Sequence, residues 1–106
     1  MRQPRQTRQQ ASQHEKILRF RVTGEGVDAD RFGAWIGPEA QNRGLDGWVR
    51  TRGADVDVLL AGDTFGVDSL VFLAGQIVEV ADGALDVQDL RGDEPIWSGF
   101  HVLPAL

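Results

Sequence analysis

Apolar residues recur in this chain with a period of two in some segments and of about 3.6 in others, and the order of these segments limits the folds open to it. The helical period predicts helices at 28–43 and 63–79, and the first is expected to be kinked or split at Pro38, because proline lacks a backbone donor. The period of two predicts strands at 16–23, 46–52, 55–60, 84–90 and 97–103. The order βαββαβ with a short extra strand is typical of an α+β, ferredoxin-like sandwich, in which two helices cover one face of an antiparallel sheet.

Capping residues set the expected ends of the two helices. Asp28 or Asp30 can cap the first helix, because a short acidic side chain accepts from the free N–H groups of the first turn. Gly44 is suited to end that helix, since glycine adopts the left-handed conformation at little cost. Asp63 or Thr64 can cap the second helix.

The tryptophans give a first estimate of what is buried. Trp35 and Trp48 are expected to anchor the core, because large aromatic rings bury much apolar surface. Trp97 follows a loop-like stretch and is expected to be partly exposed, where it could contact a partner. His101 alternates with apolar neighbours and is expected to face away from the core, without an orienting group that would make it a base.

Length and composition indicate one domain with a tail. The chain has 106 residues, 42% of them apolar, which suffices for a single small core, predicted to span 15–106. Residues 1–14 form a basic, Gln-rich tail that is predicted to be disordered, because Met1 is its only large apolar residue.

Three features missing from the sequence exclude classes of protein. No cysteine is present, which excludes disulfides, thiol catalysis and Cys-based metal sites. No run of 18 apolar residues is present, which excludes a membrane-spanning helix. The sequence does not begin with the apolar segment of a secretion signal, so a cytoplasmic location is expected.

Charge is divided unevenly along the chain. Residues 1–21 hold six bases and one acid, a net charge of +5, whereas residues 22–106 hold five bases and fifteen acids, a net charge of −10. An acidic body repels nucleic acid and anionic membranes, so neither is expected as a partner. The candidate partners are a small anion or acyl phosphate and another protein, and no cofactor is expected.

Three segments resemble the acylphosphatase family. Residues 44–51 (GLDGWVRT) are similar to its G-L-x-G-W-V-x-N segment, and residues 53–62 (GADVDVLLAG) to its D-G-x-V-E-V-x-x-x-G strand and turn. Residues 99–102 (GFHV) are similar to its final G-F-x-V strand. The resemblance covers roughly residues 16–103 and implies the same α/β sandwich and an activity on carboxyl–phosphate anhydride bonds.

The resemblance also implies where a site would lie. In the family, backbone N–H groups of the loop after the first strand hold the phosphate, an arginine starts the first helix, and an asparagine on the second strand positions water. The loop corresponds here to Gly24, Glu25, Gly26, Val27, Asp28 and Ala29. A gapless count from Trp48 puts Gly33 at the arginine position and Thr51 at the asparagine position.

Two interpretations of this departure stay open. In the first, the phosphate cradle is degenerate, hydrolysis is weak or lost, and the domain is a small binding or regulatory module rather than an enzyme. In the second, Arg31 and Thr51 stand in for the usual pair and the chain is a working acylphosphatase. The carboxylates of Glu25, Asp28 and Asp30 favour the first, because they repel a phosphate dianion.

Two other patterns carry weaker expectations. Residues 24–29 fit G-x-G-x-x-A, but a turn of small residues is favoured over a dinucleotide site, which needs a larger parallel sheet. Asp28 and Asp30, Asp55 and Asp57, and the acids between 82 and 94 could recruit a divalent cation. A solvated acidic surface is favoured instead, and no metal is expected.

Overall fold

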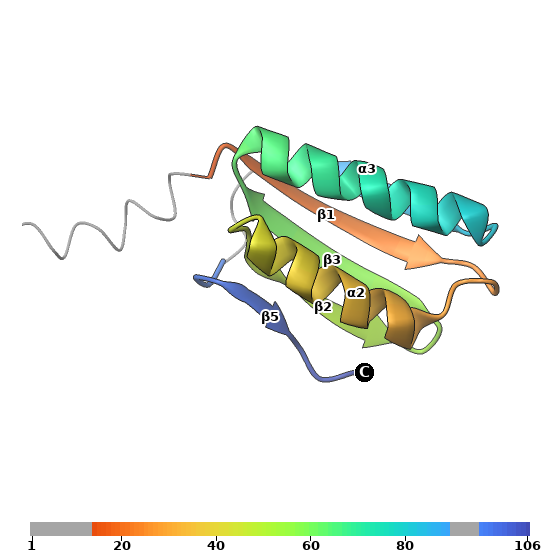
Figure 1. Cartoon of the computed structure of the whole chain (residues 1–106). Coiled ribbons are helices and arrows are strands. Elements are labelled where there is room, and N and C mark those ends of the chain that lie inside the picture. Colours follow the sequence, from red (N-terminus) through yellow and green to blue (C-terminus); the bar gives the residue numbers. More distant parts are fainter. Residues whose placement is uncertain (1–13, 90–95) are drawn as a thin grey trace, which may run out of the picture.

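Five strands form a single sheet with the order β4-β1-β3-β2-β5 in the computed structural model, which describes residues 14–89 and 96–106 (Figure 1). Neighbouring strands are antiparallel except β2 and β5, which are parallel. The strands are β1 (Lys16–Thr23), β2 (Asp46–Arg52), β3 (Asp55–Gly62), β4 (Ala84–Asp89) and β5 (Phe100–Val102). Two helices, α2 (Ala29–Asn42) and α3 (Thr64–Val80), cover one face of the sheet (Figure 1). The predicted ferredoxin-like α+β sandwich is confirmed.

The core lies between this face of the sheet and the two helices. In β1 the residues Leu18, Phe20 and Val22 alternate with more exposed ones, as period two requires. Phe20 lies opposite Val58 of the central strand β3, and Val58 in turn lies opposite Val49 of β2. The helices add Phe32, Ile36 and Ala40 from α2 and Val67, Leu70, Ala74 and Val78 from α3.

Among the described residues, no helix lies over the other face of the sheet, and the side chains of the strands themselves cover it. Leu59 is buried on that face although β3 alternates, and its register partner is Trp48. Arg19 stacks over the Trp48 ring at 5.5 Å. The expectation that Trp48 anchors the core is therefore wrong: Val49, one residue later, faces the helices and belongs to the core, whereas Trp35 does pack against the core.

Helix α2 is one continuous element, so the expectation that Pro38 splits it into two short pieces is wrong. Both Pro38 and Ala34, whose carbonyl would receive the missing N–H, are exposed, so water can satisfy that carbonyl. Asp28 is the N-cap, and Gly44, with φ of +68°, lies just past the C-cap as predicted.

The remaining boundaries agree with prediction except near the chain end. Asp63 caps α3 through Gly66 N–H at 2.9 Å, and the predicted turn of the hairpin lies at Gly53. Strand β5 spans three residues rather than the predicted 97–103, because Gly99 has φ of +86° and interrupts the extended chain. The predicted tail, apart from His14, and residue 90 lie outside the described residues. Within residues 14–89 and 96–106, no helix is long and apolar enough to cross a membrane.

Candidate functional site

The loop between β1 and α2 is packed tightly against the turn that follows α3. A Cβ added to Gly24 would lie 2.7 Å from Gly83 Cα, and one added to Gly26 would overlap the carbonyl oxygen of Ala81. Val27 N–H donates to the Gly24 carbonyl at 3.1 Å and closes the turn. Both glycines of the G-x-G pattern are therefore required by close backbone approach.

The N-terminus of α2 is occupied by the chain's own carboxylate. Asp28 Oδ1 accepts from Arg31 N–H at 3.1 Å, and the Asp28 carbonyl accepts from Phe32 N–H at 2.9 Å. A helix N-terminus attracts anions because its first N–H groups are free and its dipole end is positive. Asp28 satisfies one of these groups and adds a negative charge beside the others.

Gly33 and Thr51, which the gapless count placed at the family's two catalytic positions, meet in the structure. A Cβ added to Gly33 would lie 3.7 Å from Thr51 Cγ2, an ordinary van der Waals distance. The two residues line a cleft of about 330 Å³ between α2, β2 and the chain end, together with Asp30 and Val102. Among the described residues that line this cleft, Asp30 alone is charged.

Arg31 belongs to a different cleft. It lines an apolar cleft of about 360 Å³ on the α3 side of α2, with Phe32, Trp35 and Ile77. The rings of Phe32 and Trp35 are tilted against each other at a centroid distance of 5.6 Å. The sequence-predicted residues Arg31 and Thr51 thus line separate clefts, one on each side of α2.

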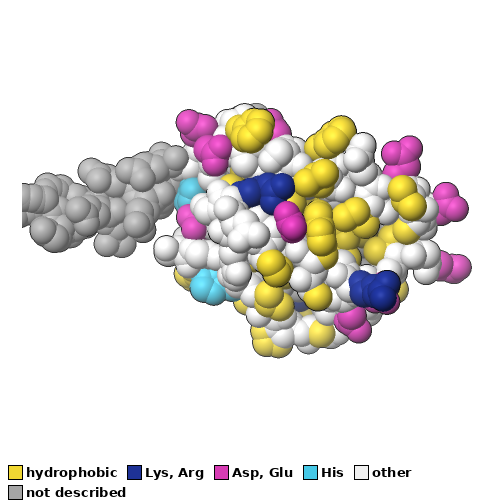
Figure 2. All heavy atoms as spheres, viewed as in Figure 1, with side chains coloured by type: hydrophobic (Ala, Val, Ile, Leu, Met, Phe, Trp, Pro, Cys, Tyr) yellow, Lys and Arg dark blue, Asp and Glu magenta, His cyan; other side chains and the backbone are white. Residues whose placement is uncertain are grey.

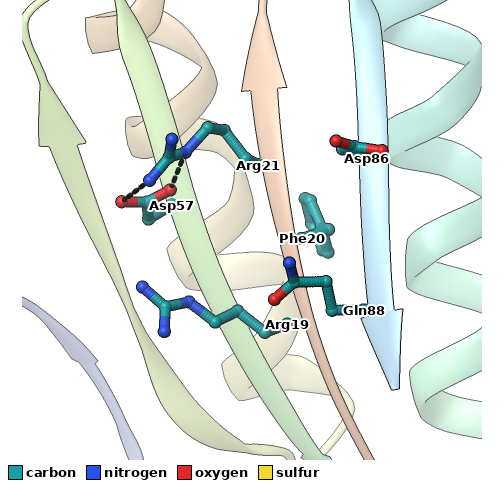
Figure 3. Close-up of a pocket in the computed structure, with 6 residues that line it drawn as sticks. All are labelled: Arg19, Phe20, Arg21, Asp57, Asp86 and Gln88. Carbon is teal, nitrogen blue, oxygen red and sulfur yellow. Dashed lines mark hydrogen bonds and ion pairs between the residues drawn. The ribbon is translucent and has the colours of Figure 1, made fainter. Parts of the chain in front are cut away.

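A third cleft lies on the helix-free face of the sheet, where Figure 3 shows Arg21 beside Asp57, with Arg19 and Gln88 nearby. Asp57 Oδ1 accepts from Arg21 Nε at 2.7 Å, and Arg52 Nε lies 3.5 Å from Asp57 Oδ2. The hydrogen bond and the charge of Asp57 raise the pKa of the Arg21 guanidinium above its ordinary value.

This arrangement corrects one expectation about the acidic side chains. Asp57 was expected to belong to a solvated acidic surface, but it is 2% exposed and paired with arginine. A carboxylate can be buried here because the guanidinium compensates the lost hydration. The cluster is a satisfied ion pair, whereas Asp55, which also faces away from the helices, is only half-buried.

A fourth cleft of about 340 Å³ lies where four distant chain segments meet, and it was not predicted from the sequence. The His14 side chain is 9% exposed, and its Nε2 lies 2.8 Å from Asp46 Oδ2. The other oxygen of Asp46 accepts from Gly99 N–H at 2.7 Å. His14 was assigned to the tail because its neighbours are polar, and no local signal indicates a partner 32 residues away.

The other predicted candidates lie apart from these clefts. His101 is exposed and its Nε2 lies 2.8 Å from the Ser98 carbonyl oxygen, and Trp97 is 56% exposed, as expected. Within residues 14–89 and 96–106, no group of three or more His, Asp or Glu side chains could hold a metal ion. The acids at 93 and 94 lie outside the described residues.

The solved structures that are similar to this chain include two acylphosphatases. The acylphosphatase from Coxiella burnetii is 17% identical and matches 87% of this chain and 96% of its own, with a TM-score of 0.67. The acylphosphatase from Bacillus subtilis is 23% identical and matches 82% of this chain and 97% of its own, with a TM-score of 0.65. Full-length HypF, solved in a phosphate- and nucleotide-bound form, is 12% identical and matches 85% of this chain through 12% of its own, with a TM-score of 0.66.

No family model matches this sequence, and no curated protein matches it either. The similarity to the two solved acylphosphatases shows that the chain has the acylphosphatase fold, at low sequence identity. The resemblance noted in the sequence is thus confirmed for the fold.

Proposed function

We propose that this chain is an acylphosphatase-like domain whose phosphate cradle is degenerate, and that it acts as a small binding or regulatory module. The observation that carries the proposal is the cleft at Gly33 and Thr51. By the gapless count from Trp48, the family's guanidinium and amide would lie there, and the chain instead supplies a hydrogen atom, a hydroxyl and the carboxylate of Asp30.

The charge of this region opposes acyl-phosphate hydrolysis. Phosphoryl transfer depends on positioning and on compensation of the charge of the equatorial oxygens, and a fixed guanidinium is suited to that task. Loss of one such donor commonly costs about 10²–10³ in rate. Asp28 at the helix N-terminus and Asp30 at the cleft add negative charge where positive charge is needed.

The working-enzyme alternative requires Arg31 to act with Thr51. Arg31 lines the cleft on the α3 side, and Thr51 lines the cleft on the opposite side of α2. A single phosphate would have to reach both, and the body of α2 lies between them. This separation supports the degenerate cradle.

Benzoyl phosphate hydrolysis tests the proposal in the wild type and in the Gly33→Arg/Thr51→Asn variant. The wild type is expected to stay near the uncatalysed rate, and the double variant to gain at least about 10²-fold, the size of one restored donor. A Cβ fits at Gly33, because it meets only Thr51 Cγ2 at an ordinary distance, and the longer side chain can extend into the cleft that Gly33 lines.

Gly75→Arg is the matched control. It makes the same chemical change on α3, where an added Cβ meets nothing within 4 Å, and should leave the rate unchanged. Turnover by the wild type that disappears in Arg31→Gln would overturn the proposal and establish the working enzyme.

A further inference from the structure

The charges on the helix-free face of the sheet divide into cross-strand rows of register partners. One row contains no acid, and we call it the Arg19 row: Gln88, Arg19, Leu59, Trp48 and His101. The next row contains two acids and two bases: Asp86, Arg21, Asp57 and Arg50. Beyond it, Arg52 lies opposite Asp55. Arg19 is therefore the arginine of this face whose own row provides no carboxylate.

The buried carboxylate in the next row is already used by other arginines. Asp57 Oδ1 accepts from Arg21 Nε at 2.7 Å, and Asp57 Oδ2 accepts from Arg21 Nη2 at 3.4 Å. Arg52 Nε lies 3.5 Å from the same Oδ2. Three guanidinium nitrogens thus share the two oxygens of Asp57, and none of them belongs to Arg19 or Arg50.

Arg19 and Arg50 keep donors that the described residues do not satisfy. The Arg19 guanidinium lies over the Trp48 ring at 5.5 Å, and Figure 3 shows no hydrogen bond from it to the residues drawn there. Arg50 lies two residues after Trp48 on the same side of β2, and its Nε is buried without a hydrogen-bond partner. A guanidinium carries only donors, so both side chains require an acceptor from elsewhere.

On the helix side, by contrast, bases lie next to acids. Figure 2 shows this side, where Lys and Arg side chains are few and hydrophobic side chains gather along α3. Arg43 Nη1 donates to Glu39 Oε1 at 2.7 Å, and Lys16 Nζ donates to Asp68 Oδ1 at 2.7 Å. These two bases are already compensated, whereas Arg19 is not.

The Arg19 row also has the shape of a small site. A cleft of about 290 Å³ on this face is lined by Arg19 and Gln88, and Figure 3 shows their side chains close together. The Gln88 side chain is exposed and offers two amide N–H donors. The planar fork of a guanidinium matches the two oxygens of a carboxylate, and such charge-assisted hydrogen bonds are the strong ones.

We propose that the Arg19 row binds a small carboxylate. The two carboxylate oxygens would accept from the Arg19 guanidinium and the Gln88 amide, and Arg50 would add positive charge from the next row. This site lies on the face of the sheet opposite the Gly33 cleft. The proposal therefore does not depend on whether that cleft hydrolyses acyl phosphates.

The rows on either side limit the ligand to a single charge. Asp57 and Asp86 lie in one neighbouring row, and Asp46 lies opposite Ala61 in the other. A nucleic-acid strand would extend over these acids, and like charges across an interface oppose association. A phosphate monoester carries close to two charges at neutral pH, whereas a carboxylate carries one. The arrangement thus favours a carboxylate over either of these ligands.

Benzoate and benzamide test the proposal with the full chain, because they share a ring and differ in charge. At constant ionic strength, benzoate is expected to bind saturably and to shift the amide resonances of residues 19, 48 and 88, whereas benzamide is not. Arg19→Gln should weaken benzoate binding about tenfold or more, the size of a lost hydrogen bond to a charged group. Gln88→Glu puts an acid into the row and should abolish binding. Because Gln88 is exposed, this second variant is expected to fold.

Arg52→Gln is the matched control on the same face. It removes the same side chain from a row in which Asp55 already lies opposite, and it should leave benzoate binding unchanged. No saturable binding, equal binding of benzamide, or an equal loss in Arg52→Gln would each overturn the proposal. Shifts confined to residues 24–31 would also overturn it and would place the anion at the cradle loop instead. Tighter binding of phenyl phosphate than of benzoate would show that the face accepts a dianion, contrary to the proposal.

Discussion

At the scale of single residues, Asp28 has two opposed effects. Its side chain caps α2, which stabilises the helix, and its charge fills the position that would attract an anion. Asp28→Ser keeps a capping oxygen and removes the charge. We expect stability to stay within about 0.5 kcal/mol of the wild type, because serine caps as well as aspartate. Phosphate should then shift the amide resonances of residues 24–31 at lower concentration than in the wild type.

Two variants control for the separate effects of cap and charge. Asp28→Ala removes both and should cost about 1 kcal/mol in urea unfolding. Asp68→Asn is the control for charge. It removes an equal charge near the N-terminal end of α3, whereas the loop at residues 24–31 lies against the turn after the C-terminal end, so phosphate binding should stay unchanged. If Asp28→Ser responds to phosphate no better than the wild type, the carboxylate is not what keeps anions from the loop.

Individual residues also show how far the sequence could predict the site. The gapless count from Trp48 assigns Gly33 and Thr51 to the family's two catalytic positions, and the structure brings these two residues together. The burial of Asp57 could not be predicted, since it depends on the register that puts Arg21 opposite it, 36 residues away. Nor does alternation decide between Trp48 and Val49 as the helix-side residue, because both are apolar.

At the scale of elements, the period of the apolar residues predicts the strands and helices better than single breaking residues do. Pro38 was expected to divide α2, yet the helix continues, because packed turns on both sides outweigh one missing hydrogen bond at an exposed position. Gly99 had been placed inside the last strand, and its positive φ instead delays that strand to Phe100. Tertiary contacts set the conformation of a glycine, so the sequence alone does not show whether the glycine continues or ends a strand or helix.

Helix α3 contains a glycine that the fold does not need. Gly75 has no positive φ, and a Cβ there would meet nothing within 4 Å. Gly75→Ala is therefore expected to stabilise the protein by about 0.5–1 kcal/mol, because alanine loses less backbone entropy in a helix. Urea unfolding measures this through the midpoint at constant slope.

The same substitution at Gly47 is the contrasting case. Gly47 has φ of +136°, and its Cβ would overlap the carbonyl oxygen of Leu59 on the neighbouring strand. Gly47→Ala should therefore destabilise the sheet strongly. A loss of stability in Gly75→Ala would mean that α3 is held in place by contacts near residue 75, contrary to the open space found there.

At the scale of the whole molecule, the two sides of the sandwich carry different chemistry. The helix side exposes apolar residues of α3 together with acids and with Arg31 and Arg43, and the other side of the sheet has its arginines partly neutralised by the buried Asp57. The composition of the chain shows only a net charge of −5 and does not reveal this division. It arises because strand alternation sends Arg19 and Arg21 to one face while the acids of α3 lie on the other.

Asp46 holds together segments from both ends of the domain, since its two oxygens contact His14 Nε2 and Gly99 N–H at the start of β2. Asp46→Ala should cost about 1.5–3 kcal/mol, the range for hydrogen bonds to a charged group. The loss should be local at first, because β5 has only three residues and pairs with β2 alone. Hydrogen exchange of residues 100–103 should therefore accelerate in this variant while the central strands β1 and β3 stay protected. Asp55→Ala, at the other end of the β2–β3 hairpin, is the control and should leave exchange in β5 unchanged. If Asp46→Ala instead accelerates exchange equally throughout the sheet, the contacts of Asp46 support the entire fold rather than its last strand.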